Sequence, residues 1–270
     1  MSFCRTSPRR TAAAIAGLAV AVAGVLVTAG ASGTAAHGIA KPRPTVVLVH
    51  GAFADSSGWN GVVARLQHDG YPVIAAANPL RGLASDAAYV SAVLHAVTGP
   101  VVLVGHSYGG PVITNAARGN LNVRALVYIA GFAPDTGETA LDLSNKFPGS
   151  TLAATLEQIP LGGGAVDLRV RQELFPQQFA ADVPPARRAA DGRRPAPYSR
   201  RRARRTLRRT IPSYFLIPTG DKNIPPAAQT FMAERAHAVV AIVKDASHAV
   251  LVSKPGITAG LIERAAKETT

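Results

Sequence analysis

The 270-residue sequence contains one cysteine, Cys4, so no two cysteines can pair within the chain. This excludes a small scaffold stabilised by disulfides. Acidic residues are missing from the first forty positions, and no internal repeat is visible. Apolar residues, by contrast, make up 47% of the chain and charged residues 17%. That composition can fill the core of one large domain and excludes a wholly disordered protein.

The formal net charge of +13 is concentrated in two segments. Residues 1–40 contribute +3, and Arg187–Arg209 contributes +10 from eleven arginines and one aspartate. The rest of the chain carries 15 basic and 15 acidic residues and is neutral. Nucleic-acid-binding proteins more often spread their basic residues over a folded face, so we expect no nucleic-acid partner.

Residues 1–36 are predicted to be a secretory signal peptide, followed by a linker at 37–44. A short basic start precedes the apolar stretch Thr11–Thr28, and small residues continue to Ala36. This order is typical of a cleaved signal. About 18 apolar residues can also span a bilayer, so an uncleaved anchor is the alternative. Arg9-Arg10 leaves a twin-arginine export route open. We expect a secreted protein without a membrane span after cleavage.

The remaining sequence alternates between two kinds of pattern. Short runs rich in apolar and β-branched residues are predicted strands: Thr45–Val49, Pro72–Ala75, Val101–Val104, Ala125–Ile129, Tyr214–Ile217 and Val239–Val243. Segments with helical spacing lie between or after them: Trp59–His68, Ser85–Val97, Pro111–Arg118, Pro225–Ala236 and Ile257–Ala266. Such alternation predicts an α/β fold, with a mostly parallel sheet of about six strands flanked by helices. Residues 134–210 are too long for a simple connection and are predicted to form a cap inserted before the last two strands.

The segment Gly105-His106-Ser107-Tyr108-Gly109-Gly110 follows a predicted strand and opens a predicted helix. It matches the G-x-S-x-G nucleophile elbow in the strand–turn–helix context that this motif requires. A serine at such a turn has a strained backbone, and its small neighbours make room for that conformation. Ser107 is therefore the candidate nucleophile.

A serine hydroxyl needs a base, and the base needs an orienting acid. His248 lies in the loop after the last predicted strand, and Asp221 follows the strand before it. The chain order serine, acid, histidine is the one that accompanies the elbow. Asp245 is closer to His248 in sequence, but loop neighbours seldom face each other correctly. Six further histidines have other assignments: His37 to the linker, His68, His95 and His237 to the surface, and His50 and His106 to packing.

The first predicted strand ends in His50-Gly51-Ala52-Phe53, a glycine loop that can present a backbone N–H to the serine. The amides of Ala52 and Tyr108 are the candidate oxyanion hole. Phe53 and Phe132 are candidates for an apolar substrate pocket.

The sequence resembles the α/β-hydrolase superfamily, in particular small esterase-like members related to plant methyl esterases and hydroxynitrile lyases. The similarity covers roughly residues 45–182 and 211–268. It is carried by Val47–Ala52, Trp59, Gly105–Gly110, Gly220–Lys222, Ser247-His248 and Ser253–Pro255. The resemblance implies a Ser107–His248–Asp221 triad, no cofactor, no metal and a helical cap over the pocket. Lyase relatives have a lysine directly after the histidine, where this chain has Ala249.

The predicted domain organisation is a hydrolase core at 45–133 and 211–270 with the cap at 134–210. Within the cap, residues 183–210 are rich in Arg, Pro and Ala and cannot bury an apolar helix face. We interpret this stretch as disordered or as the product of a local reading-frame slip. A polybasic loop that binds anionic surfaces is the rival interpretation.

Together these features predict a secreted serine hydrolase that cleaves small-molecule carboxylic esters through an acyl-enzyme. One alternative is a carbon–carbon bond lyase of the hydroxynitrile-lyase type. Another is a polyanion-binding protein that uses Arg187–Arg209. The sequence does not predict the identity of the ester or the oligomeric state.

Overall fold

The computed structural model describes residues 42–163, 165–186 and 211–270. The expected signal peptide, most of the expected linker and the run Arg187–Arg209 lie outside the described residues, so their interpretation stays a prediction. Among the residues that are described, no helix is long and apolar enough to cross a membrane.

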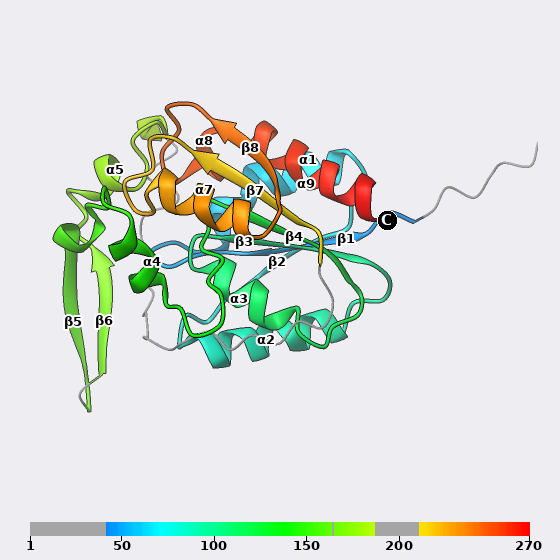
Figure 1. The fold of residues 1–270 in the computed structure, drawn as a ribbon, viewed down its shortest axis with the longest axis horizontal. Coiled ribbons are helices and arrows are strands. Elements are labelled where there is room, and N and C mark those ends of the chain that lie inside the picture. The colour runs from blue at the N-terminus through cyan, green and yellow to red at the C-terminus, as the bar shows by residue number, and fades with distance from the viewer. Residues whose placement is uncertain (1–41, 164, 187–210) are drawn as a thin grey trace, which may run out of the picture. The chain divides into compact units, whose positions relative to one another are not determined.

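The described core contains a six-stranded parallel sheet, in the order β2-β1-β3-β4-β7-β8 (Figure 1). Its strands are β1 (Thr45–Val49), β2 (Val73–Ala76), β3 (Val101–His106), β4 (Val123–Ile129), β7 (Ser213–Pro218) and β8 (Val239–Val243). The predicted fold class is therefore confirmed. The central strands β1 and β3 are buried along almost their whole length, which explains their continuous apolar sequences.

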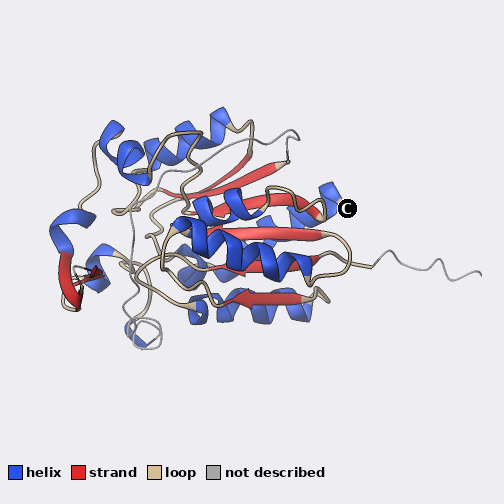
Figure 2. Cartoon of the chain, turned by 90° about the horizontal axis from the view of Figure 1, so that it is seen from below, coloured by secondary structure: helices blue, strands red, loops and turns tan. Residues whose placement is uncertain are grey.

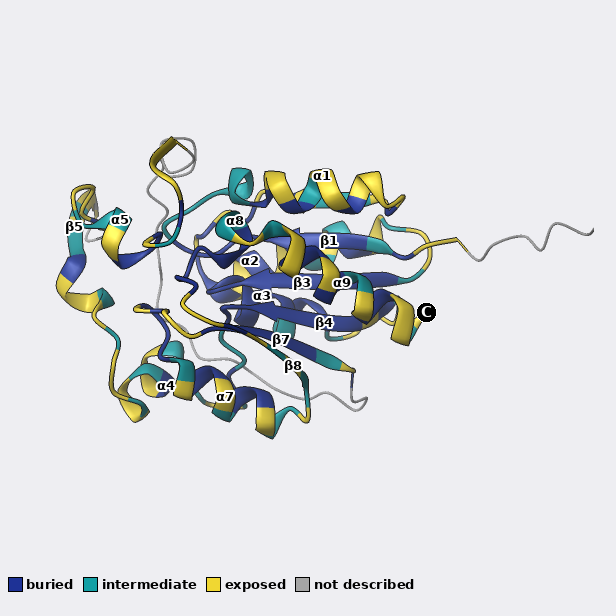
Figure 3. Ribbon diagram, turned by 90° about the horizontal axis from the view of Figure 1, so that it is seen from above, coloured by how far each residue is buried: buried dark blue, intermediate teal, exposed yellow. Residues whose placement is uncertain are grey.

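Helices cover both faces of this sheet, as Figures 2 and 3 show. One face packs against α1 (Asn60–His68), α8 (Val250–Ser253) and α9 (Pro255–Thr269). The other packs against α2 (Leu83–His95), α3 (Gly109–Ala116) and α7 (Pro226–Arg235). A 3₁₀ helix, η1 (Ser56–Trp59), precedes α1, and its Trp59 is fully buried in the first of these two cores. In a parallel sheet that helices cover on both faces, ligand and catalytic sites form in the loops at the carboxyl ends of the strands.

The described part of the cap differs from the helical cap that the resemblance implied. It contains the short helices α4 (Ala140–Lys146), η2 (Leu152–Thr155) and α5 (Phe175–Gln178) and a two-stranded antiparallel sheet of β5 (Leu156–Gly162) and β6 (Ala165–Val170). In β6, apolar residues alternate with polar ones, a period of two that suits a strand. The implication of a helical cap is therefore correct only in part.

Candidate active site

Ser107 lies in the turn between β3 and α3. Its φ of 53° is in the left-handed region that residues other than glycine rarely adopt. Backbone hydrogen bonds hold the turn: the Ser107 N–H donates to the Ile129 carbonyl (3.1 Å), and the Ser107 carbonyl accepts from Gly110 (3.0 Å) and Phe132 (3.2 Å). Strain of this kind persists only where the surrounding fold enforces it, and it is concentrated at functional sites.

Glycines let three backbone segments meet around Ser107. A Cβ atom added to Gly105 would lie 2.5 Å from the Gly109 carbonyl oxygen, and one added to Gly109 would lie 2.5 Å from the Val49 carbonyl oxygen. A Cβ atom added to Gly51 would lie 2.6 Å from Ser107 Cβ. These separations are too short for a real side chain, so the loop after β1 lies directly against Ser107.

The loops after β7 and β8 bring Asp221 and His248 together. His248 Nδ1 lies 2.8 Å from Asp221 Oδ2, and both side chains are buried. The carboxylate also accepts from the N–H groups of Asn223 (2.8 Å) and Ile224 (3.0 Å) at Oδ1 and from Gln229 Nε2 (2.9 Å) at Oδ2. An ionised carboxylate only accepts, so His248 Nδ1 carries a proton and Nε2 of the neutral ring holds a lone pair.

His106 links the nucleophile turn to the histidine loop. Its Nε2 lies 3.0 Å from the His248 carbonyl oxygen, and the two imidazole rings have centroids 4.8 Å apart. His248 Nε2 is buried and has no hydrogen-bond partner within the part of the chain that the structure describes. It is therefore not hydrogen-bonded to Ser107 in this structure. Bonds between a catalytic nucleophile and its base are often long in free enzymes and shorten when substrate binds.

The candidate oxyanion residues lie on the two segments that meet at Ser107. Ala52 is buried and follows Gly51, and Tyr108 directly follows Ser107. The Tyr108 hydroxyl donates to Asp86 Oδ2 (2.8 Å), a carboxylate that is fully buried at the start of α2. Neither Asp86 nor Gln229 could be predicted from the sequence, because a polar residue inside a helix carries no local signal for such a contact.

Asp245, the acid that sequence analysis set aside, is exposed, and His248 Nδ1 bonds to Asp221 instead. His68, His95 and His237 are exposed, in agreement with their assignment to the surface. His50 is buried, and its Nδ1 lies 3.0 Å from the Gly51 carbonyl oxygen. That contact fits the packing role expected of His50.

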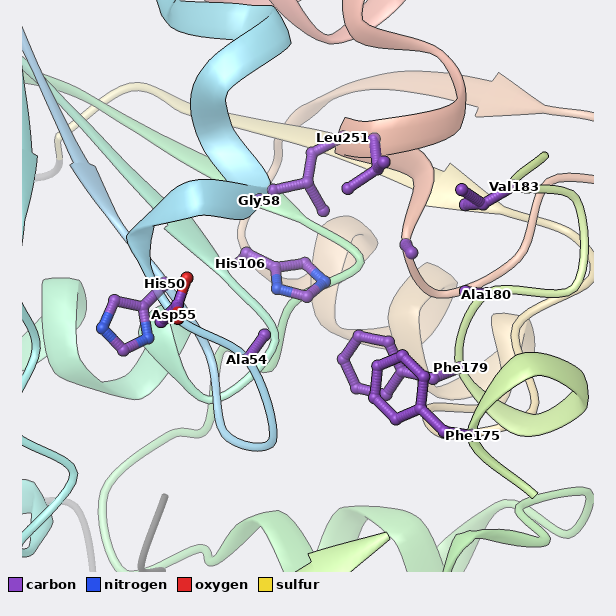
Figure 4. A pocket seen from close by; sticks show the side chains of 12 residues that line it. His50, Ala54, Asp55, Gly58, His106, Phe175, Phe179, Ala180, Val183 and Leu251 are labelled. Atoms are coloured by element: carbon purple, nitrogen blue, oxygen red, sulfur yellow. The ribbon is translucent and has the colours of Figure 1, made fainter. Parts of the chain in front are cut away.

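Figure 4 shows an apolar pocket whose lining residues come from the cap, from the loop after β1 and from positions next to Ser107 and His248. Cap residues Phe175 and Phe179 line one side of it, with ring centroids 4.9 Å apart. His106 and Ala249, the sequence neighbours of Ser107 and His248, also line it. Its other lining residues are His50, Ala54, Asp55, Gly58, Ala180, Val183, Leu251 and Val252.

The expected pocket residues Phe53 and Phe132 do not line this pocket in the described chain. Both are half-buried and pack against the core on the side of α2, α3 and α7. Phe53 also packs against a buried cluster of pocket-lining residues: Phe179, Ala180, Val183 and Ala249. Their assignment to a substrate site stays a prediction.

Burial lowers the pKa of His50 below 6.5 and lowers the pKa of His106 well below that value; the nearby His248 lowers the pKa of His106 further. Between these lowered values and 6.5, the unfolded chain binds protons that the folded protein excludes. The free energy of unfolding therefore falls as the pH drops below 6.5 and is insensitive to these two groups above it.

We expect the His106→Gln variant to lose part of this pH dependence. Each buried histidine contributes a slope of up to about 1.4 kcal/mol per pH unit below its unfolded pKa. The glutamine amide can still donate to the His248 carbonyl but does not titrate. Urea denaturation of both proteins at several pH values between 7.5 and 5.5 measures the difference. Equal slopes would contradict a neutral, buried His106.

The sequence model of the alpha/beta hydrolase family matches residues 46–261. The chain belongs to this family. An alpha/beta hydrolase (nvfD) of Aspergillus novofumigatus is 26% identical over 252 residues, which cover 84% of this chain and 98% of that protein. A carbendazim hydrolyzing esterase of a Nocardioides species is 31% identical over 134 residues, covering 42% of this chain and 55% of the esterase.

Among solved structures, polyneuridine aldehyde esterase aligns with a TM-score of 0.70 at 15% identity, covering 82% of this chain and 98% of that one. At this identity the likeness shows the fold alone. The resemblance to small esterase-like α/β hydrolases is confirmed, and the chain is a hydrolase with esterases among its relatives.

Proposed function

We propose that the protein hydrolyses carboxylic esters of small molecules, with Ser107 as nucleophile, His248 as general base and Asp221 as the acid that orients it. The observation that carries this proposal is the buried His248–Asp221 pair, whose Nε2 lone pair is unpaired among the described residues. The hydrogen bond between His106 and the His248 carbonyl connects the His248 loop to the strained turn of Ser107. The relative named as a carbendazim hydrolyzing esterase favours a substrate of the ester class.

In the acylation step, Ser107 Oγ attacks the ester carbonyl carbon while His248 Nε2 takes the hydroxyl proton. The imidazolium that forms is stabilised by the Asp221 carboxylate. Amide N–H groups of Ala52 and Tyr108 stabilise the negative oxygen of the tetrahedral intermediate. As the intermediate collapses, the bond to the alcohol oxygen breaks, His248 returns the proton to that oxygen, and the alcohol leaves.

In the deacylation step, a water molecule gives a proton to His248 Nε2 and attacks the acyl carbon. The same two amides stabilise the second tetrahedral intermediate. The bond from the acyl carbon to Ser107 Oγ then breaks, and His248 returns the proton to the serine oxygen. The products are a carboxylic acid and the regenerated enzyme.

Trapping the acyl-enzyme tests this proposal. We expect protein mixed with p-nitrophenyl butyrate and quenched in acid to gain the mass of one butyryl group, located on the peptide that contains Ser107. Ester turnover with an adduct on another residue would contradict the proposed mechanism. So would a failure to hydrolyse any of a series of p-nitrophenyl esters, or cleavage of cyanohydrins in place of esters.

A further inference from the structure

The cap turn Gln178–Asp182 contacts both loops that carry the acid and the base. It begins at the last residue of α5 and lies in the part of the cap that follows the β5–β6 sheet. On one side it is hydrogen-bonded to residues that follow Asp221, and on the other to both sequence neighbours of His248.

On the acid side, Gln178 is 5% exposed and uses both ends of its amide. Its Nε2 donates to the Lys222 carbonyl (2.9 Å) and to Asn223 Oδ1 (2.7 Å). Its Oε1 accepts from the Thr151 hydroxyl (2.8 Å), so the amide orientation is fixed. The Asn223 N–H in turn donates to Asp221 Oδ1. Gln178 is therefore connected to the Asp221 carboxylate through one residue, Asn223.

On the base side, the Ala249 N–H donates to the Phe179 carbonyl (2.9 Å). Asp182 Oδ1 accepts from both the N–H (3.0 Å) and the hydroxyl of Ser247. His248 is thus held between two residues that are each bound to the cap. The Phe179 ring also meets the His248 ring edge-on, with centroids 4.7 Å apart.

The Asp182 carboxyl is suited to a lasting contact of this kind. Burial is the largest single influence and raises its pKa, but the hydroxyls of Ser247 and Ser253 and nearby backbone N–H groups together outweigh burial, so the pKa lies below its usual value. The group is therefore ionised at neutral pH. Hydrogen bonds to an ionised acceptor are roughly twice as strong as neutral ones.

We propose that Gln178 and Asp182 are positioning residues, through which the cap holds the Asp221 loop and the His248 loop in the register needed for their 2.8 Å hydrogen bond. This inference rests on the proposed function of the pair. The two loops follow different strands, and β8, which precedes His248, is the edge strand, with Val240 and Ile242 exposed. Between the loops themselves, the Gly220 N–H donates to the Ala246 carbonyl (2.9 Å). The hydrogen bonds of Gln178 and Asp182 add a second set of contacts, which connects both loops to the cap.

We expect Asp182→Ala and Gln178→Ala each to lower kcat for ester hydrolysis about 10- to 100-fold, since a displacement of about 1 Å in a catalytic group has effects of that size. KM is expected to change little, because neither side chain lines the apolar pocket. Asp182→Asn should keep most of the activity, because an amide oxygen can accept the same two bonds from Ser247. Gln177→Ala is the matched control, since Gln177 is the exposed neighbour in the same helix.

A second measurement does not depend on ester turnover. We expect the proton that His248 Nδ1 donates to Asp221 to give a far-downfield proton NMR resonance, which Ser107→Ala should retain and Asp221→Ala should lose. We expect this resonance to broaden or shift in Asp182→Ala and Gln178→Ala, and to keep its position in Asp182→Asn and Gln177→Ala. If the wild-type protein hydrolyses no ester, the proposed function fails while the resonance still tests the positioning role.

An unchanged resonance in folded Asp182→Ala and Gln178→Ala would overturn the inference, and so would an unchanged kcat in both. A loss of activity through higher KM alone would overturn it as well, because it would indicate a binding role. Circular dichroism and thermal unfolding show whether each variant is folded. Should Asp182→Ala fail to fold, Ser247→Ala removes the hydroxyl half of the same contact and is expected to give a smaller fall in kcat with the same NMR change.

Discussion

Replacing Ser107 with alanine is expected to lower kcat for ester hydrolysis by a factor on the order of 10⁵–10⁶, as removal of a serine nucleophile does in a comparable triad. Alanine deletes the oxygen that attacks the carbonyl and leaves the fold intact, because its Cβ occupies the same position at the same φ. The proposed oxyanion amides remain, so turnover is expected to stay above the uncatalysed rate. Steady-state rates with p-nitrophenyl esters measure the loss.

The same variant should lose covalent labelling by a fluorophosphonate probe, which reacts with activated serines. Ser213→Ala is a suitable control, because Ser213 lies at the amino end of β7, the opposite end of the sheet from the site. Labelling and turnover should be unchanged in that control. Labelling that survives in Ser107→Ala would assign the reactive oxygen to another residue and contradict the elbow assignment.

The fold and the contact between Asp221 and His248 could be predicted from the strand pattern and from the chain order that accompanies the nucleophile elbow. Strands β1 and β8 have the expected bounds because their continuous apolar runs are short and bordered by turns. The contact between Asp221 and His248 was expected because both follow strands of one parallel sheet, whose carboxyl ends meet at one edge. Chain order then selected Asp221 over Asp245.

The contacts made by the cap could not be predicted in this way. Gln178 and Asp182 reach residues 44 and 65 positions away, and nothing in their local sequence marks them as different from exposed neighbours such as Gln177. The β5–β6 sheet was also missed, because neither strand has a continuous apolar run like that of β1 or β8, and β5 contains Pro160, which is uncommon inside strands. Long-range contacts and short hairpins depend on tertiary packing, which periodicity does not contain.

Asp221→Asn is expected to lower kcat about 10⁴-fold, the effect of the same change in a serine protease triad. Asp221 Oδ2 accepts from both His248 Nδ1 (2.8 Å) and Gln229 Nε2 (2.9 Å). Backbone N–H groups of Asn223 and Ile224 hold the other oxygen, so an asparagine keeps its oxygen there and points its NH₂ group at the histidine. Nδ1 must then accept, the ring proton moves to Nε2, and the lone pair that takes the serine proton is lost.

Asp245→Asn provides the matched control for this change. Asp245 is an exposed carboxylate three residues before His248, and its substitution removes the same charge close to the same loop. We expect its kcat to stay within about 2-fold of wild type, since exposed charges act weakly through water. A larger loss in Asp245→Asn than in Asp221→Asn would reassign the acid. Comparable stability of both variants in thermal unfolding would show that the difference arises from the state of the imidazole and not from the fold.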